Sequence, residues 1–337
     1  MSVNDLRDHG SVPLPRELYV EVTNRCNSLC LTCPLTWGGQ EAKNDLGFAE
    51  FLALVDELPS VQRVVLHGIG EPLLNHELPR MIAELKRRGA TVLFNSNAIA
   101  LTHRIQRKLI ESRLDELRVS LDAARRETYA RVRGVDAFEK VLSNVGAMVR
   151  LQQELGVEKP RLSVWFTGMR DNIAELPDLV RAAAHHGIPE VHLQRLVYRG
   201  IGLAVKEQAI YHSHDDEVYS AVERAMALAK ELGVVLTTSG RNRAPIDHNH
   251  PQGGSAPWHG CTRPWRLAYV TANGNLLPCC IAPFTGVPYD SIILGNVQGR
   301  SLADLWNGER YREFRARHAS RDNPPECCRL CGDEWSL

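Results

Sequence analysis

Hydrophobic positions along the first two thirds of the chain alternate between two spacings. Short apolar runs are each followed by a segment whose apolar residues recur every three to four positions, which is typical of an amphipathic helix. The runs predict six strands, at residues 18–22, 63–67, 91–95, 116–121, 162–167 and 190–196. Helices are expected between them, at residues 48–58, 78–88, 102–112, 126–155 and 173–186. This alternation favours parallel strands joined by crossover helices, so we expect an α/β fold with a partial (βα)6 TIM-like barrel.

The pattern changes toward both ends of the chain. Residues 1–17 form an N-terminal extension, and the barrel is expected over 18–238, with a further helix at 215–232 and a short strand at 234–238. A Gly-, Pro-, Asn- and His-rich linker follows at 239–260. Residues 261–337 carry closely spaced cysteines and a hairpin around the Asn273-Gly274 turn signal, so they predict a small cysteine-rich α+β domain.

Composition and charge remove several classes of protein. Hydrophobic residues make up 44% of the 337, too many for a disordered chain. The 40 basic and 40 acidic residues cancel, which argues against a nucleic-acid partner bound by bulk charge. No apolar run has the length of a membrane span, and the N-terminus lacks the apolar core of a signal peptide. We therefore expect a cytoplasmic protein with neither nucleic acid nor membrane as a partner.

Nine cysteines fall into two groups. In a reducing compartment, clustered thiols are more typical of metal sites than of disulfides. The first group, Cys26, Cys30 and Cys33, follows the first strand with the spacing C-x3-C-x2-C. Three thiolates can hold three irons of a cubane cluster and leave the fourth iron open to an outside ligand. A structural zinc site needs a fourth protein ligand, which only a side chain brought in by folding, such as His67, could supply.

The second group lies in the last 77 residues. Cys261, Cys279, Cys328 and Cys331 make a full set of four ligands, with the last two in a C-x2-C pair. Cys280 and Cys327 are their neighbours in sequence and remain alternates. Four thiolates suit either one closed iron–sulfur cluster or zinc, so both readings stay open on spacing alone.

Further motifs follow the later strands. They are Gly68-Ile69-Gly70-Glu71-Pro72, Asn95-Ser96-Asn97, Ser120-Leu121-Asp122 and the arginines Arg131 and Arg133. Together with the first cysteine group, this ordered series resembles the radical S-adenosylmethionine (SAM) superfamily. The resemblance implies a SAM-bound [4Fe-4S] cluster on Cys26, Cys30 and Cys33, and reductive cleavage of SAM to a 5′-deoxyadenosyl radical that takes a hydrogen atom from the substrate.

The resemblance also implies SAM contacts. The residues it points to are Gly68, Gly70, Glu71, Pro72, Asn95, Ser96, Asn97, Ser120, Asp122, and Arg131 or Arg133. Two positions depart from the family pattern. Ile69 separates the two glycines of the GGEP-like segment, and Thr32 stands where many members have an aromatic residue before the third cysteine.

The C-terminal region resembles the SPASM and twitch extensions of the same superfamily. The matching segments run from Cys261-Thr262-Arg263-Pro264-Trp265 through Asn273-Gly274 to Pro278-Cys279, and end with Cys328 and Cys331. This resemblance implies an auxiliary [4Fe-4S] cluster. Because the best pattern supplies four thiolates, we expect one such cluster, held by Cys261, Cys279, Cys328 and Cys331.

These motifs predict a radical SAM oxidoreductase that acts on a small polar metabolite. A sugar, aminocyclitol or nucleoside-type intermediate of natural-product biosynthesis is favoured, oxidised with the auxiliary cluster as electron acceptor and with a flavodoxin or ferredoxin as reductant. Arg195 and Arg199, at or after the end of the sixth strand, are the candidate catalytic residues. The alternatives are a peptide or protein maturase, a radical epimerase or carbon–carbon bond-forming enzyme, and a non-catalytic metal-binding protein. About 17 residues precede the first strand, too few for the leader-recognition domain of many peptide maturases, so we place the maturase second.

Overall fold

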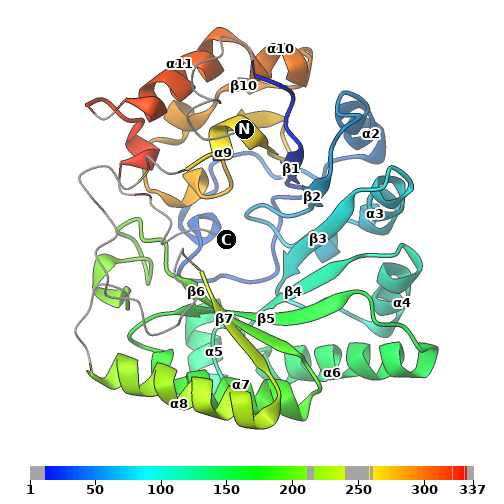
Figure 1. The fold of residues 1–337 in the computed structure, drawn as a ribbon, viewed down its shortest axis with the longest axis vertical. Helices are drawn as coiled ribbons and strands as arrows, with labels where there is room; N and C mark the ends of the chain where they lie inside the picture. Colours follow the sequence, from blue (N-terminus) through cyan, green and yellow to red (C-terminus); the bar gives the residue numbers. More distant parts are fainter. Residues whose placement is uncertain are drawn as a thin grey trace.

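One curved sheet organises the computed structural model, which describes residues 12–210, 216–239, 258, 261–320, 322–329 and 331. Its ten strands lie in the order β10-β9-β8-β1-β2-β3-β4-β5-β6-β7 (Figure 1). The strands are β1 (Glu17–Val20), β2 (Arg63–Val65), β3 (Thr91–Ser96), β4 (Glu116–Ser120), β5 (Arg161–Gly168), β6 (Glu190–Arg195), β7 (Val235–Thr238), β8 (Leu267–Val270), β9 (Asn275–Leu277) and β10 (Gly295–Asn296).

Strands β1 to β7 are all parallel to their neighbours and follow one another in sequence order. Crossover helices cover the outer side of the sheet (Figure 1). They are α2 (Phe48–Asp56), α3 (Leu78–Arg87), α4 (His103–Glu111), α5 (Arg126–Arg133), α6 (Phe138–Leu155), α7 (Leu176–His185) and α8 (Asp216–Leu232). The predicted α/β partial barrel is thus confirmed, and β7 adds a seventh parallel strand beside β6.

The apolar spacing of α6 shows why these helices form on this side of the sheet. Val141, Leu142, Val145 and Met148 recur every three to four residues and are buried, so one stripe of the helix faces the core. Gly134 and Gly156 end α5 and α6 in the left-handed conformation, with φ of 65° and 64°. The predicted helical stretch 126–155 is therefore two helices, because the glycine after Arg133 stops the first of them.

The C-terminal region continues the same sheet. Strand β8 pairs with β1 in parallel, with Leu267 opposite Glu17 and Val270 opposite Val20. The predicted hairpin is present, because β9 runs antiparallel to β8 and Gly274, with a φ of 81°, makes the turn between them. Short helices α9 (Arg263–Arg266), α10 (Leu302–Trp306) and α11 (Glu309–Ala319) complete this region beside β10 (Figure 1).

The N-terminal extension packs on the C-terminal region where the structure describes it. Val12 donates its backbone N–H to Asn307 Oδ1 at 2.9 Å, and Trp306 Nε1 donates to the carbonyl of Pro13 at 2.9 Å. The predicted linker, 239–260, lies outside the described residues except for Ser239 and Trp258. None of the helices in the described ranges has the length and apolar character that a bilayer span requires.

Candidate active site

A cavity of about 210 Å³ opens at the carboxyl ends of the parallel strands. Its wall combines the cysteine loop after β1, the loops after β2 and β3, the ends of β4, β5, β6 and α5, and part of the C-terminal region. Cys26, Cys30 and Cys33 all line it. The site therefore lies where parallel α/β sheets usually bind ligands.

The cysteine loop is held in place by the end of α5. Leu29 donates its backbone N–H to the carbonyl of Arg133 at 3.1 Å, and Leu31 donates to that of Val132 at 2.9 Å. Gly134 fits directly beneath this loop, since a Cβ at that position would stand 2.3 Å from the carbonyl oxygen of Leu29. The loop's position thus depends on a helix that ends in a glycine.

The three thiols of this loop interact electrostatically. Burial, together with the nearby Cys30 and Cys26, raises the pKa of Cys33 to about 12. Among the described residues, no three His, Cys, Asp or Glu side chains converge tightly enough to bind one metal ion. A zinc ion gathers its thiolates at about 2.3 Å, whereas each thiolate of an iron–sulfur cluster binds a different iron, so this triad suits a cluster better than zinc.

Arg133 and Arg131 lie in different environments. Arg133 lines the cavity and donates from Nη1 to Asp122 Oδ2 at 2.8 Å. Burial opposes its charge, but the Cys30 thiol and the Asp122 carboxyl raise the pKa of Arg133 above its usual value. Arg131 instead pairs with Asp171 on the surface, with 44% of its side chain exposed. Two residues along a helix point about 200° apart, so only one of the two arginines can face the cavity.

Asp122 supports Arg133 without lining the cavity itself. Its Oδ2 accepts from Arg133, and its Oδ1 accepts the backbone N–H of Thr167 at 2.8 Å. The carboxylate thus ties the segment after β4 to strand β5. Ser120, two residues earlier, does line the cavity.

Glu71 joins the loop after β2 to the end of β3. Its carboxylate accepts hydrogen bonds from the backbone N–H of Leu73 at 3.1 Å, from Ser96 Oγ at 2.7 Å and from the backbone N–H of Asn97 at 2.7 Å. Burial raises the pKa of Glu71. Both oxygens already have protein donors, so these contacts make Glu71 part of the frame of the site. Its contact with SAM remains a prediction.

The two asparagines after β3 differ in what they contact. Asn97 donates from Nδ2 to Asn27 Oδ1 at 2.7 Å and to Ser28 Oγ at 3.3 Å, and the same atom lies 3.8 Å from Cys26 Sγ. Asn97 thus braces the cysteine loop. Asn95 lines the cavity, and its Oδ1 is buried without a hydrogen-bond partner. A ligand could therefore bond to this oxygen only if the side chain turned toward the cavity.

The glycines of the GGEP-like segment allow a close approach to β1 and the loop after it. A Cβ on Gly68 would lie 2.1 Å from Glu21 Oε2, and one on Gly70 would lie 2.0 Å from the carbonyl oxygen of Thr23. Both glycines line the cavity, whereas Pro72 starts the short helix η2 (Pro72–Leu74) outside it.

The structure does not bring Arg195 and Arg199 into the cavity. Gln194 and Leu196 line it, whereas Arg195 between them is buried outside its wall. Alternation along a strand explains the difference. Thr167 is a cavity residue that our sequence prediction omitted, and the period of two in β5 was the signal for it. His67, which the sequence offered only as a possible zinc ligand, also lines the cavity.

The second cysteine group gathers on the C-terminal side of the cavity. Burial raises the pKa of Cys279, as do Cys280, Cys331 and Cys327, while Arg263 lowers it. Cys327 Sγ and Cys328 Sγ lie 3.9 Å apart. All nine cysteines belong to the described residues, and none of them forms a disulfide.

Cys280 is distinguished from Cys279 by its orientation. Cys280 lines the cavity together with Ile281 and Phe284. The second cysteine group therefore borders the same cavity as the first. A group bound there would lie beside the substrate space.

Comparison with known proteins agrees with this geometry. The model of the radical SAM superfamily matches residues 20–183, and that of the SPASM iron–sulfur cluster-binding domain matches residues 261–332. The chain is 24% identical over 326 residues to the tungsten-containing aldehyde ferredoxin oxidoreductase cofactor-modifying protein of Pyrococcus furiosus, covering 88% of this chain and 82% of the relative. It is 26% identical over 328 residues to the PqqA peptide cyclase of Granulibacter bethesdensis, covering 96% and 81%.

Solved structures show the same fold. SuiB of Streptococcus suis bound to SAM superposes with a TM-score of 0.71 at 16% identity, covering 93% of this chain and 71% of SuiB. A second SuiB structure, bound to its precursor peptide SuiA, gives 0.70 at 14% identity, covering 93% and 69%. The two matched domains imply three cofactors: SAM, the [4Fe-4S] cluster that binds SAM, and auxiliary iron–sulfur clusters. The chain is a radical SAM enzyme with a C-terminal SPASM domain, a member of the radical SAM superfamily.

Proposed function

We propose that this enzyme abstracts a hydrogen atom from a peptide and thereby modifies it. The observation that carries the proposal is the charge of the cavity wall. Among its described lining residues, the acidic and basic side chains other than thiols and His67 are Glu71 and Arg133, and both have protein partners. The remaining wall offers amide, hydroxyl and apolar groups, which suits a neutral peptide segment better than a charged metabolite.

The comparisons support the same substrate class. One relative is a peptide cyclase, and one structural neighbour binds a precursor peptide. The small polar metabolite expected from the sequence is less well supported, since a cationic aminocyclitol or a nucleotide would find no unpaired counter-charge among these lining residues.

Different residues of the site bind the cluster, SAM and the substrate. Cys26, Cys30 and Cys33 would hold the cluster that binds SAM, and SAM supplies the 5′-deoxyadenosyl radical when an electron reaches it. Arg133, Asn95 and Ser120 offer polar atoms to SAM on one wall. Thr167, Gln194 and Leu196 form the wall across β5 and β6, where we place the substrate. Cys261, Cys279, Cys328 and Cys331 would hold one auxiliary [4Fe-4S] cluster, and a flavodoxin or ferredoxin would deliver the electron.

The first test is anaerobic reconstitution followed by iron analysis and reduction with dithionite in the presence of SAM. We expect about eight irons per chain and formation of 5′-deoxyadenosine. Two pools of compounds are then compared. One holds synthetic octapeptides with acetyl and amide caps, and the other holds sugars, aminocyclitols and nucleosides.

The peptide pool should stimulate 5′-deoxyadenosine formation and yield a peptide of changed mass. The variant Cys30→Ala, which lacks one cluster ligand, should abolish both. Stimulation by the metabolite pool alone would overturn the peptide assignment and restore the small-molecule alternative. The radical SAM chemistry itself would be unaffected by that result.

A further inference from the structure

His67 lies where the cavity meets the interior of the barrel. It lies two residues after the end of β2, and its Nδ1 accepts the backbone N–H of Asn95 at 3.0 Å. A neutral imidazole carries one N–H and one acceptor nitrogen. Because Nδ1 is the acceptor, the proton of a neutral His67 is on Nε2.

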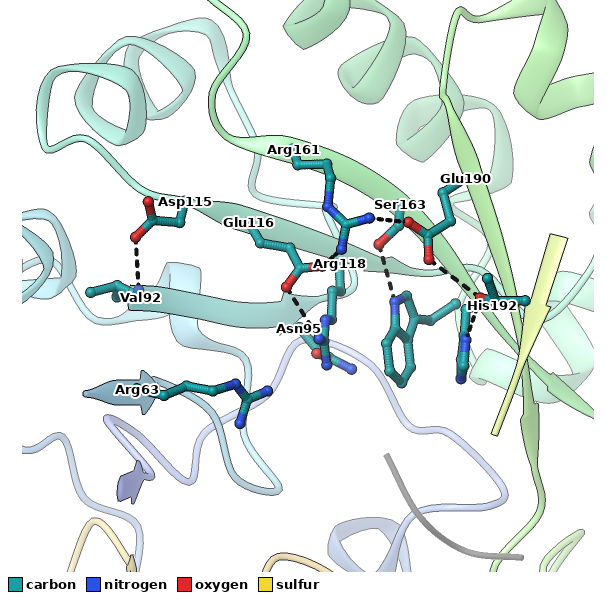
Figure 2. Close-up of polar contacts among 12 residues, drawn as sticks. Arg63, Val92, Asn95, Asp115, Glu116, Arg118, Arg161, Ser163, Glu190 and His192 are labelled. Atoms are coloured by element: carbon teal, nitrogen blue, oxygen red, sulfur yellow. Dashed lines mark hydrogen bonds and ion pairs between the residues drawn. The ribbon is translucent and has the colours of Figure 1, made fainter. Parts of the chain in front are cut away.

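A layer of polar and aromatic side chains lies beneath this histidine. Figure 2 shows Arg63, Arg118 and His192 reaching into the barrel interior from β2, β4 and β6. The guanidinium of Arg118 lies 4.3 Å from the ring centre of Trp165, and the rings of Trp165 and His192 are 4.1 Å apart. Barrels of this class are usually filled by branched aliphatic residues, so this charged layer is a special feature of the chain.

Burial keeps His67 neutral, and these charges add to the effect. Burial, followed by the positive charges of Arg118 and Arg63, lowers the pKa of His67 to about 3. From β1, the ring of Tyr19 meets it edge-on at 5.7 Å, and from β3 the backbone N–H of Asn95 reaches it. No carboxylate bonds to it among the contacts of the described residues, so nothing on these strands stabilises an imidazolium.

The opposite side of the ring faces the ligand space. His67 lines the cavity with Thr167 and Gln194, and Nε2 is the polar atom of the ring that Asn95 leaves available. We propose that His67 binds the substrate, donating a hydrogen bond from Nε2–H to a substrate oxygen. On the proposed function, that oxygen is a peptide carbonyl, and the bond fixes the peptide for hydrogen abstraction.

Two variants of the reconstituted holoenzyme separate this role from a structural one. His67→Asn can keep an acceptor for the Asn95 N–H but has no donor at the position of Nε2. His67→Gln can place an N–H near that position. The probe is the pool of capped octapeptides, and the readout is 5′-deoxyadenosine formed with and without it.

His67→Asn should lower the peptide-stimulated rate about five- to tenfold, as expected for one lost hydrogen bond. His67→Gln should recover most of the stimulation. Equal rates for His67→Asn and the unmodified enzyme, or equal losses in both variants, would overturn the proposal.

A spectroscopic measurement tests the same group without any substrate. The ¹⁵N shifts of the His67 imidazole should show a protonated Nε2 and an unprotonated Nδ1 throughout pH 6 to 8. A charged ring, or a proton on Nδ1, would refute a neutral Nε2–H donor. If no peptide stimulates the unmodified enzyme, the proposed peptide function is wrong. The ¹⁵N measurement does not depend on that result and tests separately whether His67 has a neutral Nε2–H donor.

Discussion

Arg133 and Asp122 form an ion pair at 2.8 Å with 10% and 4% of their side chains exposed, whereas Arg131 forms its ion pair with Asp171 at the surface. Replacing Arg133 by Met leaves a buried carboxylate without its cation. We expect the free energy of unfolding to fall by about 3–5 kcal/mol. Urea denaturation under anaerobic conditions measures this loss of unfolding free energy.

The matched variant Arg131→Met removes the exposed pair only. Its cost should be about 0–1 kcal/mol, because exposed pairs are screened by solvent. SAM binding should weaken in Arg133→Met and persist in Arg131→Met. Equal stability losses in the two variants would contradict the assignment of the buried arginine to the cavity.

Gly134 and Gly156 have almost the same φ but different surroundings. A Cβ on Gly134 would stand 2.3 Å from the carbonyl oxygen of Leu29, whereas one on Gly156 would meet nothing within 4 Å. Gly134→Ala should therefore displace the cysteine loop and reduce the iron bound after reconstitution by roughly half. Gly156→Ala should cost about 1 kcal/mol of backbone strain and leave the iron content unchanged. Iron loss in both variants would show that strain alone, and not contact with the loop, is responsible.

Glu21 couples folding to pH. Burial raises its pKa from 4.5 to about 7, although Ile69, Ala272 and Tyr269 donate hydrogen bonds to its carboxylate that lower it. Between pH 4.5 and about pH 7, Glu21 is protonated in the folded chain and ionised in the unfolded chain. The contribution of Glu21 is therefore fully present below pH 4.5 and falls by about 3 kcal/mol as pH rises through 7.

The variant Glu21→Gln isolates this effect, because an amide does not titrate. The difference in unfolding free energy between Glu21→Gln and the unmodified protein should change by about 3 kcal/mol between pH 4.5 and pH 8, in favour of the variant at high pH. A difference that is the same at every pH would show that Glu21 titrates normally in the folded protein.

The two adjacent cysteines of the SPASM domain should respond differently to substitution. Cys279 interacts electrostatically with Cys327 and Cys331, whereas Cys280 lines the cavity. We expect Cys279→Ser to remove about four irons per chain and Cys280→Ser to remove none. The opposite pattern would make Cys280 the ligand. Iron analysis and electron paramagnetic resonance of the reduced protein distinguish the two results.

Much of the fold could be predicted from local sequence patterns. Each strand of the barrel contains its own apolar run, and each crossover helix its own stripe, so β1 to β6 were found without knowledge of their partners. The pairing of β8 with β1 could not be found in this way, because residues some 250 positions apart meet there and both strands are buried. Local pattern says nothing about which buried strands become neighbours.

The site was predictable in its motifs but not in the direction of its side chains. Arg131 and Arg133 fit the same motif, and only the helical phase of α5 separates the exposed one from the buried one. Gln194 and Arg195 are both polar, so alternation on β6 gave two choices and no means of deciding between them. Arg118 packs on Trp165 of the neighbouring strand β5, a contact between strands that the sequence does not reveal.

The parallel pairing of β1 with β8 has a consequence for electron transfer. The first cysteine group follows β1, and Cys279 follows β9, so one hydrogen-bonded sheet sets the separation of the two groups. Buried strands open only when much of a protein unfolds, whereas loops open readily. Loops at the cavity can thus rearrange while the distance between the two cysteine groups stays constant, so clusters bound there would keep a fixed tunnelling distance.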